Sequence, residues 1–570
     1  MSAIRVRGGL VFDGSGAPGR VQDLFVRDGV VAGPGPVDEE IDATGCWVTP
    51  GFVDLHTHYD AEVEVLPSLS ESVRHGVTTV VLGSCSLSLA VGRPVDLADM
   101  FCRVEAIPRS VVLPLLESRK DWDGPASYLS HLDSLPLGPN VASFLGHSTI
   151  RMSAMGVERS LTRDVAPSRR EMRRMEYLLD EALDAGYLGM SIQTLPWDKM
   201  DGEAFRSRPM PSVFARWSEY GKLAGHLRRR GRVLQGVPDL TTKINVLLFY
   251  LMSCGLGRRT LKTTIISLMD VRGDRLSFRI AGWLAQVCNK VLRADFRLQA
   301  LPEVFDLWAD GIDLVVFEEF GAGTAALHLQ DMAARSALLR DSGYRDRFKR
   351  EWRSRFLPKA FHRRLKHCQI LACPEGRLIG KTFSEVALER GADEVDVFLD
   401  LVAEHGSKLR WFTVMGNDRP DALRWIVSHP SALIGFSDAG AHLRNMAHYN
   451  FPLRMLRLVH DAERRGESFM TVGRAVHRLT GEIADWLGID AGRLAIGKRA
   501  DLVVVDPLGL DASLDEAHEV EMEGFGLARL VRRNDRAVRA VLINGRPAWR
   551  DGRIDSRLGR ERGFGSVLRA

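Results

Sequence analysis

The chain has few cysteines, little net charge and no long apolar run, and each shortage excludes a class of protein. Its 570 residues include seven cysteines, without tight spacing, which indicates a reducing cytoplasm rather than a disulfide scaffold. A formal net charge of +4 gives no reason to expect a nucleic-acid partner. The longest apolar candidate, residues 244–251, is far shorter than the roughly 20 residues of a membrane span.

The rest of the composition is that of an ordinary globular chain, with 45% hydrophobic and 26% charged residues. The first residues enter a strand pattern directly, without a signal peptide. We therefore expect a cytoplasmic protein without a membrane partner. The sequence leaves a homo-oligomer open.

Two histidines follow the first strongly apolar strand. After residues 46–50 the chain reads Gly-Phe-Val-Asp-Leu-His-Thr-His-Tyr-Asp over residues 51–60. Side chains alternate along a strand, so His56 and His58 point to the same side. Neutral imidazoles suit zinc and its neighbours, and this pair therefore predicts a divalent-metal site.

A second apolar strand lies far downstream and ends in an acid. Residues 432–436 run into Ser437 and Asp438, with His442 a turn later. The two strands bracket what we expect to be one barrel with a metal at its mouth. Asp438 is then predicted to act as metal ligand, as general base, or as both.

Between these strands the pattern alternates strand and helix. We expect strands at 78–82, 188–192, 233–237 and 263–268, and helices at 173–185 and 213–230. Such alternation predicts parallel strands with helices outside. The continuously apolar runs 79–82 and 314–317 are typical of parallel strands buried on both faces. Active sites of such barrels lie at the C-terminal strand ends, which is where the candidate ligands fall.

The two ends of the chain predict a small β-sandwich. Asp28-Gly29, Asn544-Gly545 and Asp551-Gly552 are hairpin signals between short strands. We expect residues 1–49 and 491–570 to pair into this sandwich. The (β/α)8 barrel then occupies residues 50–490.

Residues 320–372 form a basic, mostly helical insertion in the barrel. One interpretation is a lid or a site for an anionic group. The other, which we favour, is a helical excursion whose charges face water.

Five further motifs carry a family resemblance: Gly76–Cys85, Gly146–Arg151, Ala185–Ser191, Ser437–His442 and Leu494–Asp506. Together with the His-x-His they resemble the second, third, fourth and eighth strands and the sandwich return strand of the amidohydrolase superfamily. Within it they are most similar to the D-aminoacylase (N-acyl-D-amino-acid deacylase) branch. The resemblance implies a TIM-like barrel with a β-sandwich.

The resemblance also implies a metal centre. It makes Cys85 a thiolate ligand beside His56, His58 and Asp438, around one or two zinc ions or another divalent metal. The deacylases also carry a His at the ends of strands five and six. The corresponding segments here, residues 232–239 and 262–270, contain none. Strand four ends without a Lys, which argues against a carbamylated-lysine bridge.

On the substrate side, the resemblance implies a small molecule that carries a carboxylate, and therefore an Arg near the barrel mouth. Arg151 and Arg444 follow two of the motifs and are the candidates. His147 is a candidate metal ligand or substrate-orienting residue. Ordinary structural roles remain open for all three.

The leading functional hypothesis is metal-dependent hydrolysis of an amide outside peptide bonds, most plausibly an N-acyl-D-amino acid, with Asp438 as the catalytic proton carrier. An alternative substrate is a cyclic amide, a lactone or a peptide-like specialised metabolite, since fold does not fix substrate. A third hypothesis, motivated by the missing histidines, is a degenerate amidohydrolase with a ligand-binding or non-hydrolytic role.

Overall fold

The computed structural model describes residues 3–239, 243–354 and 360–570, and it confirms the predicted (β/α)8 barrel with a small β-sandwich. Eight parallel strands form one curled sheet. In chain order they are β6 (Phe52–Asp54), β8 (Val77–Leu82), β9 (Asn140–Gly146), β10 (Gly189–Gln193), β11 (Val233–Val237), β12 (Lys262–Ile265), β13 (Asp295–Ala300) and β17 (Ala432–Ile434).

The sheet closes on itself through two short extensions of its edge strands. β7 (His56–Thr57) continues β6, β18 (Phe436–Ala439) continues β17, and the two pair in parallel with Phe436 opposite His56. The first and last strands of the barrel are therefore neighbours. Closure brings the His-x-His and Asp438, which are almost 400 residues apart in sequence, to the same rim.

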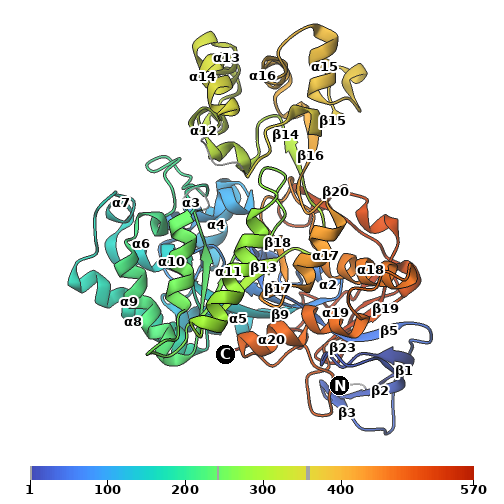
Figure 1. Ribbon diagram of the computed structural model, residues 1–570. Helices are drawn as coiled ribbons and strands as arrows, with labels where there is room; N and C mark the ends of the chain where they lie inside the picture. Colours follow the sequence, from blue (N-terminus) through green and yellow to red (C-terminus); the bar gives the residue numbers. More distant parts are fainter. Residues whose placement is uncertain (1–2, 240–242, 355–359) are drawn as a thin grey trace.

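Helices cover the outside of the barrel, as expected for parallel strands (Figure 1). They include α5 (Pro125–Ser134), α8 (Arg169–Ala185), α9 (Trp217–Arg230), α10 (Lys243–Ser253), α11 (Ser277–Val291), α17 (Pro420–Ser428), α18 (Phe451–Arg464), α19 (Val472–Leu479) and α20 (Gly481–Leu487). Shorter excursions are α1 (Glu62–Val65), α2 (Ser70–Val73), α3 (Pro94–Glu105), α4 (Arg109–Arg119), α6 (His147–Met155) and α7 (Val157–Ser160).

Helix α8 shows how local sequence sets these boundaries. Ser168 accepts a hydrogen bond from the Glu171 backbone N–H, and the Glu171 carboxylate accepts from the Ser168 backbone, which makes a capping box. Gly186 ends the helix in the left-handed conformation at φ 104°, where glycine has no steric penalty.

One strand expected from the sequence is wrong. The apolar run 314–317 is not a barrel strand, because Val315–Glu319 forms a 3₁₀ helix outside the barrel. A run of only four apolar residues suits a buried helix as well as a buried strand. The seventh barrel strand is instead β13, whose polar Arg297 and Gln299 interrupt the apolar pattern.

The chain ends join in one nine-stranded sheet. From the N-terminus come β1 (Ile4–Val11), β2 (Arg20–Arg27), β3 (Val30–Ala32), β4 (Glu39–Asp42) and β5 (Trp47–Pro50); from the C-terminus come β19 (Leu502–Val505), β22 (Val538–Ile543), β23 (Arg546–Arg550) and β24 (Arg553–Ile554). β5 and β19 pair directly across the two halves. Both residues of each predicted turn, such as Asn544-Gly545, have positive φ, as a type I′ hairpin requires.

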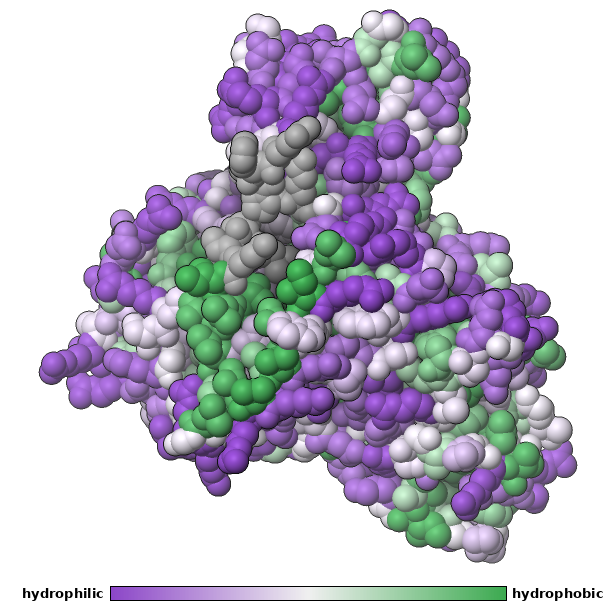
Figure 2. Space-filling view, viewed as in Figure 1, coloured by the Kyte–Doolittle hydropathy of each residue, from purple (hydrophilic) through white to green (hydrophobic). Residues whose placement is uncertain are grey.

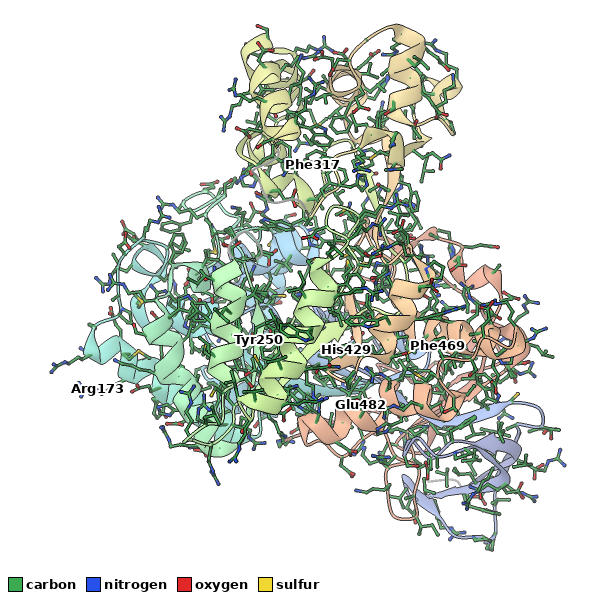
Figure 3. The ribbon with its side chains drawn as sticks, in the orientation of Figure 1. Arg173, Tyr250, Phe317, His429, Phe469 and Glu482 are labelled. Carbon is green, nitrogen blue, oxygen red and sulfur yellow. The ribbon has the colours of Figure 1, made fainter. Side chains whose placement is uncertain are left out.

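Residues 305–416, which we call the lobe, stand apart from the barrel at the top of Figure 1. The lobe holds a three-stranded antiparallel sheet, β14 (Phe305–Asp310), β15 (Cys368–Ala372) and β16 (Arg410–Gly416). Around it lie α12 (Gly321–His328), α13 (Met332–Arg340), α14 (Ser342–Arg353), α15 (Phe383–Arg390) and α16 (Glu394–His405). Its own core gathers around Phe317 (Figure 3), Trp352, Phe398 and Trp411. The lobe is thus wider than the predicted insertion at 320–372.

The basic residues of the lobe mostly meet carboxylates of the lobe itself. Arg345 and Lys349 on α14 pair with Asp396 on α16, and buried Arg363 pairs with Glu319. These pairs hold α14 against α16, so the positive charge is largely balanced within the lobe. Most of the described basic residues at 320–372 nevertheless face water, as the favoured expectation had it: Arg340, Arg347, Arg350, Arg353, Arg364 and Lys366 are exposed.

The remaining described strands, β20 (His518–Met522) and β21 (Leu527–Val531), form a separate hairpin. Across the described residues, we find no helix with both the length and the apolar character needed to cross a bilayer.

Candidate metal centre and active site

Four predicted ligands converge at the C-terminal rim of the barrel. His56 and His58 follow β6, Cys85 follows β8, and Asp438 lies in β18. Cys85 and Asp438 have φ values of 52° and 58°, a left-handed conformation that is uncommon for residues other than glycine. Backbone of this kind persists only where the surrounding structure holds it, and it is enriched at functional sites.

Three pairs of donor atoms have the spacing found between ligands of one tetrahedral ion. Nε2 of His56 lies 3.3 Å from Sγ of Cys85 and 3.6 Å from Oδ1 of Asp438. Nε2 of His58 lies 3.3 Å from the same carboxylate oxygen. Ligands about 2.0 to 2.3 Å from one zinc ion at tetrahedral angles are about 3.3 to 3.6 Å from each other. The two imidazoles and the thiol therefore lie close enough to share a single ion such as zinc, and the Asp438 carboxylate lies beside both imidazoles.

His56 and Asp438 have the protonation states that a cation needs, whereas the raised pKa values of Cys85 and His58 favour their protonated forms. Burial lowers the pKa of His56 to about 4, despite the opposing charge of Asp438, so its imidazole is neutral at neutral pH. Burial raises the pKa of the Cys85 thiol well above its usual value, and nearby carboxylates raise it further. Burial also acts to raise the pKa of Asp438, but the hydrogen bond and charge of His58 outweigh it and hold that pKa well below its usual range. A bound metal would favour the thiolate, which burial alone disfavours.

Two buried glutamines, on the strands to either side of β12, lie beside Nδ1 of His56. Nδ1 of His56 lies 2.6 Å from Oε1 of Gln299 on β13 and 3.1 Å from Nε2 of Gln235 on β11. When Nδ1–H donates to Gln299, the lone pair of Nε2 is directed at the ligand cluster. In that state the amide nitrogen of Gln235, itself a donor, packs against Nδ1 without a hydrogen bond to it. Sequence reasoning missed this role of both glutamines. The available signal was a polar residue at an inward position of an otherwise apolar strand.

Strands five and six supply no histidine. β11 and β12 lie where the sequence placed them, and the chain has no His between His226 and His328. His226 is on α9, where Nδ1 contacts Asp180 at 2.9 Å. The rim at β11 and β12 instead presents apolar residues, among them Val237 and Ile266.

A cavity of about 200 Å³ lies over the ligand cluster, between the barrel rim and the lobe. His58, Cys85 and Asp438 form its floor together with Asp198 and His442. The barrel contributes Leu195, Trp197, Val237, Pro238, Ile266 and Met269, and the lobe contributes Phe305, Leu307, Leu314, Val315, Val316 and Met415. The lobe therefore closes the top of the cavity. Among the described residues that line it, none is Lys or Arg.

The structure places the three predicted substrate-binding residues elsewhere. His147 and Arg151 are buried and both contact the carboxylate of Glu219 on α9. Arg444 pairs with Asp310 and Glu519. None of the three is among the described residues that line the cavity, so their substrate-binding role stays a prediction. His442 belongs to one of the motifs of the sequence analysis, which assigned it no role, although it lies in the cavity floor.

Comparison with known proteins gives the family of this chain. Residues 39–204 and 315–548 match the model of the amidohydrolase family. The chain belongs to the amidohydrolase family. Within the family, it is 27% identical over 564 residues to a D-aminoacylase from Alcaligenes xylosoxydans xylosoxydans, covering 95% of this chain and 94% of that protein. It is 48% identical over 561 residues to an uncharacterized protein from Mycobacterium tuberculosis, covering 96% and 92% of the two chains.

The fold comparison points the same way. The crystal structure of N-acyl-D-glutamate deacylase from Bordetella bronchiseptica, complexed with zinc and a phosphonate inhibitor, has a TM-score of 0.63 at 23% identity and full coverage of both chains. A D-aminoacylase crystal structure gives a TM-score of 0.64 at 22% identity, also over both whole chains. As an amidohydrolase with deacylase relatives, the chain is a metal-dependent hydrolase of carbon–nitrogen bonds.

Proposed function

We propose that this amidohydrolase removes the acyl group from N-acyl amino acids that carry apolar substituents, in the manner of a D-aminoacylase. The observation that carries the proposal is the cluster of His56, His58 and Cys85, with His58, Cys85 and Asp438 exposed to an apolar cavity. The relatives that support it are a D-aminoacylase and deacylases of N-acyl-D-aspartate and N-acyl-D-glutamate.

In this proposal His56, His58 and Cys85 hold one divalent cation, with Asp438 as a fourth donor or as the proton carrier beside it. When bound, the cation polarises the amide carbonyl and lowers the pKa of water. A catalytic site needs one open position, so Asp438 is the donor we expect to give way.

The roles of the chain's own residues follow from their charge states. Asp438 is ionised at neutral pH, so its carboxylate accepts a proton from the attacking water and passes it to the leaving nitrogen. Water thus cleaves the C–N bond to give a carboxylate and an amine. Burial lowers the pKa of His442, so its neutral imidazole is available to donate a hydrogen bond to the carbonyl oxygen as negative charge develops there.

The cavity wall argues for apolar substrate groups. The α-carboxylate is common to all N-acyl amino acids, whereas N-acyl-aspartate and N-acyl-glutamate add a second carboxylate, for which no Lys or Arg is present among the described lining residues. A buried charge without a partner is strongly disfavoured. We therefore infer a preference for apolar amino acids such as leucine, methionine and phenylalanine.

One observation favours a second candidate, a binding role without hydrolysis. The rim at β11 and β12 presents Val237 and Ile266, where the deacylases of the resemblance carry histidines. If one cation is insufficient for chemistry, the cavity remains as a site for an apolar ligand.

A substrate panel on the zinc-loaded protein separates these candidates. N-acetyl and longer N-acyl derivatives of D-leucine, D-methionine, D-aspartate and D-glutamate, with the L-forms beside them, are assayed for amine release. Hydrolysis of the D-leucine and D-methionine derivatives in preference to the acidic ones supports the proposal. Saturable binding of the same compounds without amine release favours the binding role. A preference for the acidic derivatives contradicts the argument from the cavity wall.

A further inference from the structure

Helices α10 and α11 lie side by side on the outside of the barrel and share an apolar outer surface. The Tyr250 hydroxyl on α10 donates to the Ala281 carbonyl on α11 over 2.8 Å, and Figure 3 shows Tyr250 between the two helices. What we call the apolar face is Ile244, Leu247 and Leu251 on α10 with Leu276, Ile280, Trp283 and Val291 on and beside α11. Each is between 45% and 68% exposed. Figure 2 shows the hydrophobic surface that runs over this part of the molecule.

This surface is unusual for an outer barrel helix. Ile244, Leu247 and Leu251 follow the i, i+3, i+7 spacing of one helix face, while Phe249 and Tyr250 bury the other face against the barrel. By contrast, α8 turns arginines outward, and Arg173 projects from the molecule in Figure 3. An outer helix that is apolar on both faces indicates a partner on the outside.

The same stretch of chain carries a strong positive charge. Residues 228–293 contain thirteen Lys and Arg against three Asp, a net charge of +10, whereas the whole chain carries only +4. Carboxylates outside the stretch balance part of this charge, because Arg230 pairs with Asp180 and Asp184, and Arg272 and Arg275 pair with Asp418.

Part of this charge lies at one end of the apolar face. Arg258 and Arg259 follow α10, and Lys290 and Arg293 lie at the end of α11, all exposed. The two ends meet, because the Thr260 hydroxyl donates to the Arg293 carbonyl. Arg258 and Arg259 donate to backbone carbonyls, which leaves their positive charge uncompensated by those bonds.

We propose that the apolar face and its basic end dock onto a membrane surface that contains anionic lipid, with α10 and α11 lying in the plane of the interface. Exposed Leu, Ile and Trp side chains enter the boundary between headgroups and acyl chains, while Lys and Arg meet lipid phosphates. A second copy of this chain would offer no phosphates to Arg258, Arg259, Lys290 and Arg293, and the test distinguishes the two occupants.

Docking would bring lipid near the active site. α10 follows β11 and α11 follows β12, and residues at or after the ends of those strands, Val237, Ile266 and Met269, line the apolar cavity. The proposal does not depend on the hydrolytic activity, and its test does not use it.

The test is co-sedimentation of the full chain with vesicles of phosphatidylcholine alone and of phosphatidylcholine mixed with phosphatidylglycerol. We expect binding to the mixed vesicles that weakens as salt is added. Leu247→Ser with Trp283→Ser should reduce that binding at least tenfold. Arg258→Gln with Arg259→Gln should reduce it about tenfold and flatten its salt dependence. Leu388→Ser, at a residue 84% exposed on α15 of the lobe, is the matched control and should bind as the unchanged chain does.

Thermal melts and metal content of each variant establish that the fold is intact. The proposal is overturned if the unchanged chain ignores anionic vesicles, or if it binds neutral vesicles equally well. It is also overturned if light scattering reveals a dimer that Trp283→Ser dissociates, because a second copy then covers the apolar face.

Discussion

At the ends of β7, β8 and β18 the barrel presents imidazole, thiol and carboxylate groups, whereas at β11 and β12 it presents Val237, Pro238, Ile266 and Met269. The first group of residues can bind a cation and move protons, and the second can do neither. The difference teaches that the two tasks of a hydrolase, chemistry and substrate binding, are divided here between two sides of one rim. It also supports one metal position rather than two.

The largest expected effect comes from replacing both histidines of the ligand cluster. In His56→Ala/His58→Ala we expect the bound metal to be lost and turnover to fall below detection, at least about 10⁴-fold, because both metal-ligand nitrogens are gone. Elemental analysis and amine release measure the two effects. His226→Ala, which alters a histidine on the outer helix α9, should retain both metal and turnover. Metal that remains at one equivalent in the double variant would place the site elsewhere.

Asp438→Asn tests the proton carrier of the polar side. We expect kcat to fall about 10³-fold, because the amide cannot accept a proton, with KM changed much less. Steady-state kinetics on the zinc-loaded protein measures the split, and Asp198→Asn, another cavity carboxylate, is the comparison. A loss of less than tenfold in Asp438→Asn would assign the proton transfer to a different group.

Gln299→Leu tests the hydrogen bond that orients the His56 ring. The variant removes the acceptor that fixes His56 Nδ1 and should weaken zinc affinity by about 10- to 100-fold. Competition with a chelator at constant pH gives the affinity. Gln235→Leu should have the smaller effect, because its amide is the more distant of the two. Equal zinc affinity in the unchanged chain and in both variants would show that the two glutamines only pack in the core.

Trp197→Ala enlarges the cavity next to its apolar wall. Each CH₂ that the cavity buries contributes about 0.8 kcal/mol, so kcat/KM should rise about fourfold per CH₂ of a substrate's apolar group until the cavity is filled. The variant should lose about tenfold on long acyl groups and little on acetyl, which serves as the internal control. A uniform loss across chain lengths would show that Trp197 supports the metal side instead.

The polar side of the rim was largely predictable from sequence, and the apolar side was not. His56, His58 and Asp438 are marked by local patterns, because strand alternation and strand ends are properties of a few consecutive residues. The apolar wall has no such mark. Leu307 and Met415 are ordinary core residues in sequence, and only the packing of the lobe over the barrel places them in the cavity.

The same distinction explains the other differences. The sequence did not reveal which carboxylates pair with the basic residues of the lobe, because Asp396 lies some fifty residues from its partners on α14. β13 was missed because Arg297 and Gln299 interrupt its apolar pattern. Periodicity reports local structure well, but ion pairs and cavities between distant segments depend on tertiary structure.

The smallest expected effect concerns His147, a strand-end histidine whose ring nitrogens contact Ser212 and Glu219 rather than the ligand cluster. Burial lowers its pKa despite the hydrogen bond to Glu219, whose carboxylate also pairs with Arg151. The folded state therefore resists protonation, while the unfolded chain takes up a proton near pH 6.5. The stability that His147 contributes is present above pH 6.5 and is lost as the pH falls below it, by at most about 1.4 kcal/mol per pH unit. In His147→Gln, which cannot titrate, the fall in melting temperature between pH 7 and pH 5 should be shallower than in the unchanged chain. Zinc content at pH 7 should be the same in both proteins. An unchanged pH slope with reduced zinc would make His147 a member of the metal side.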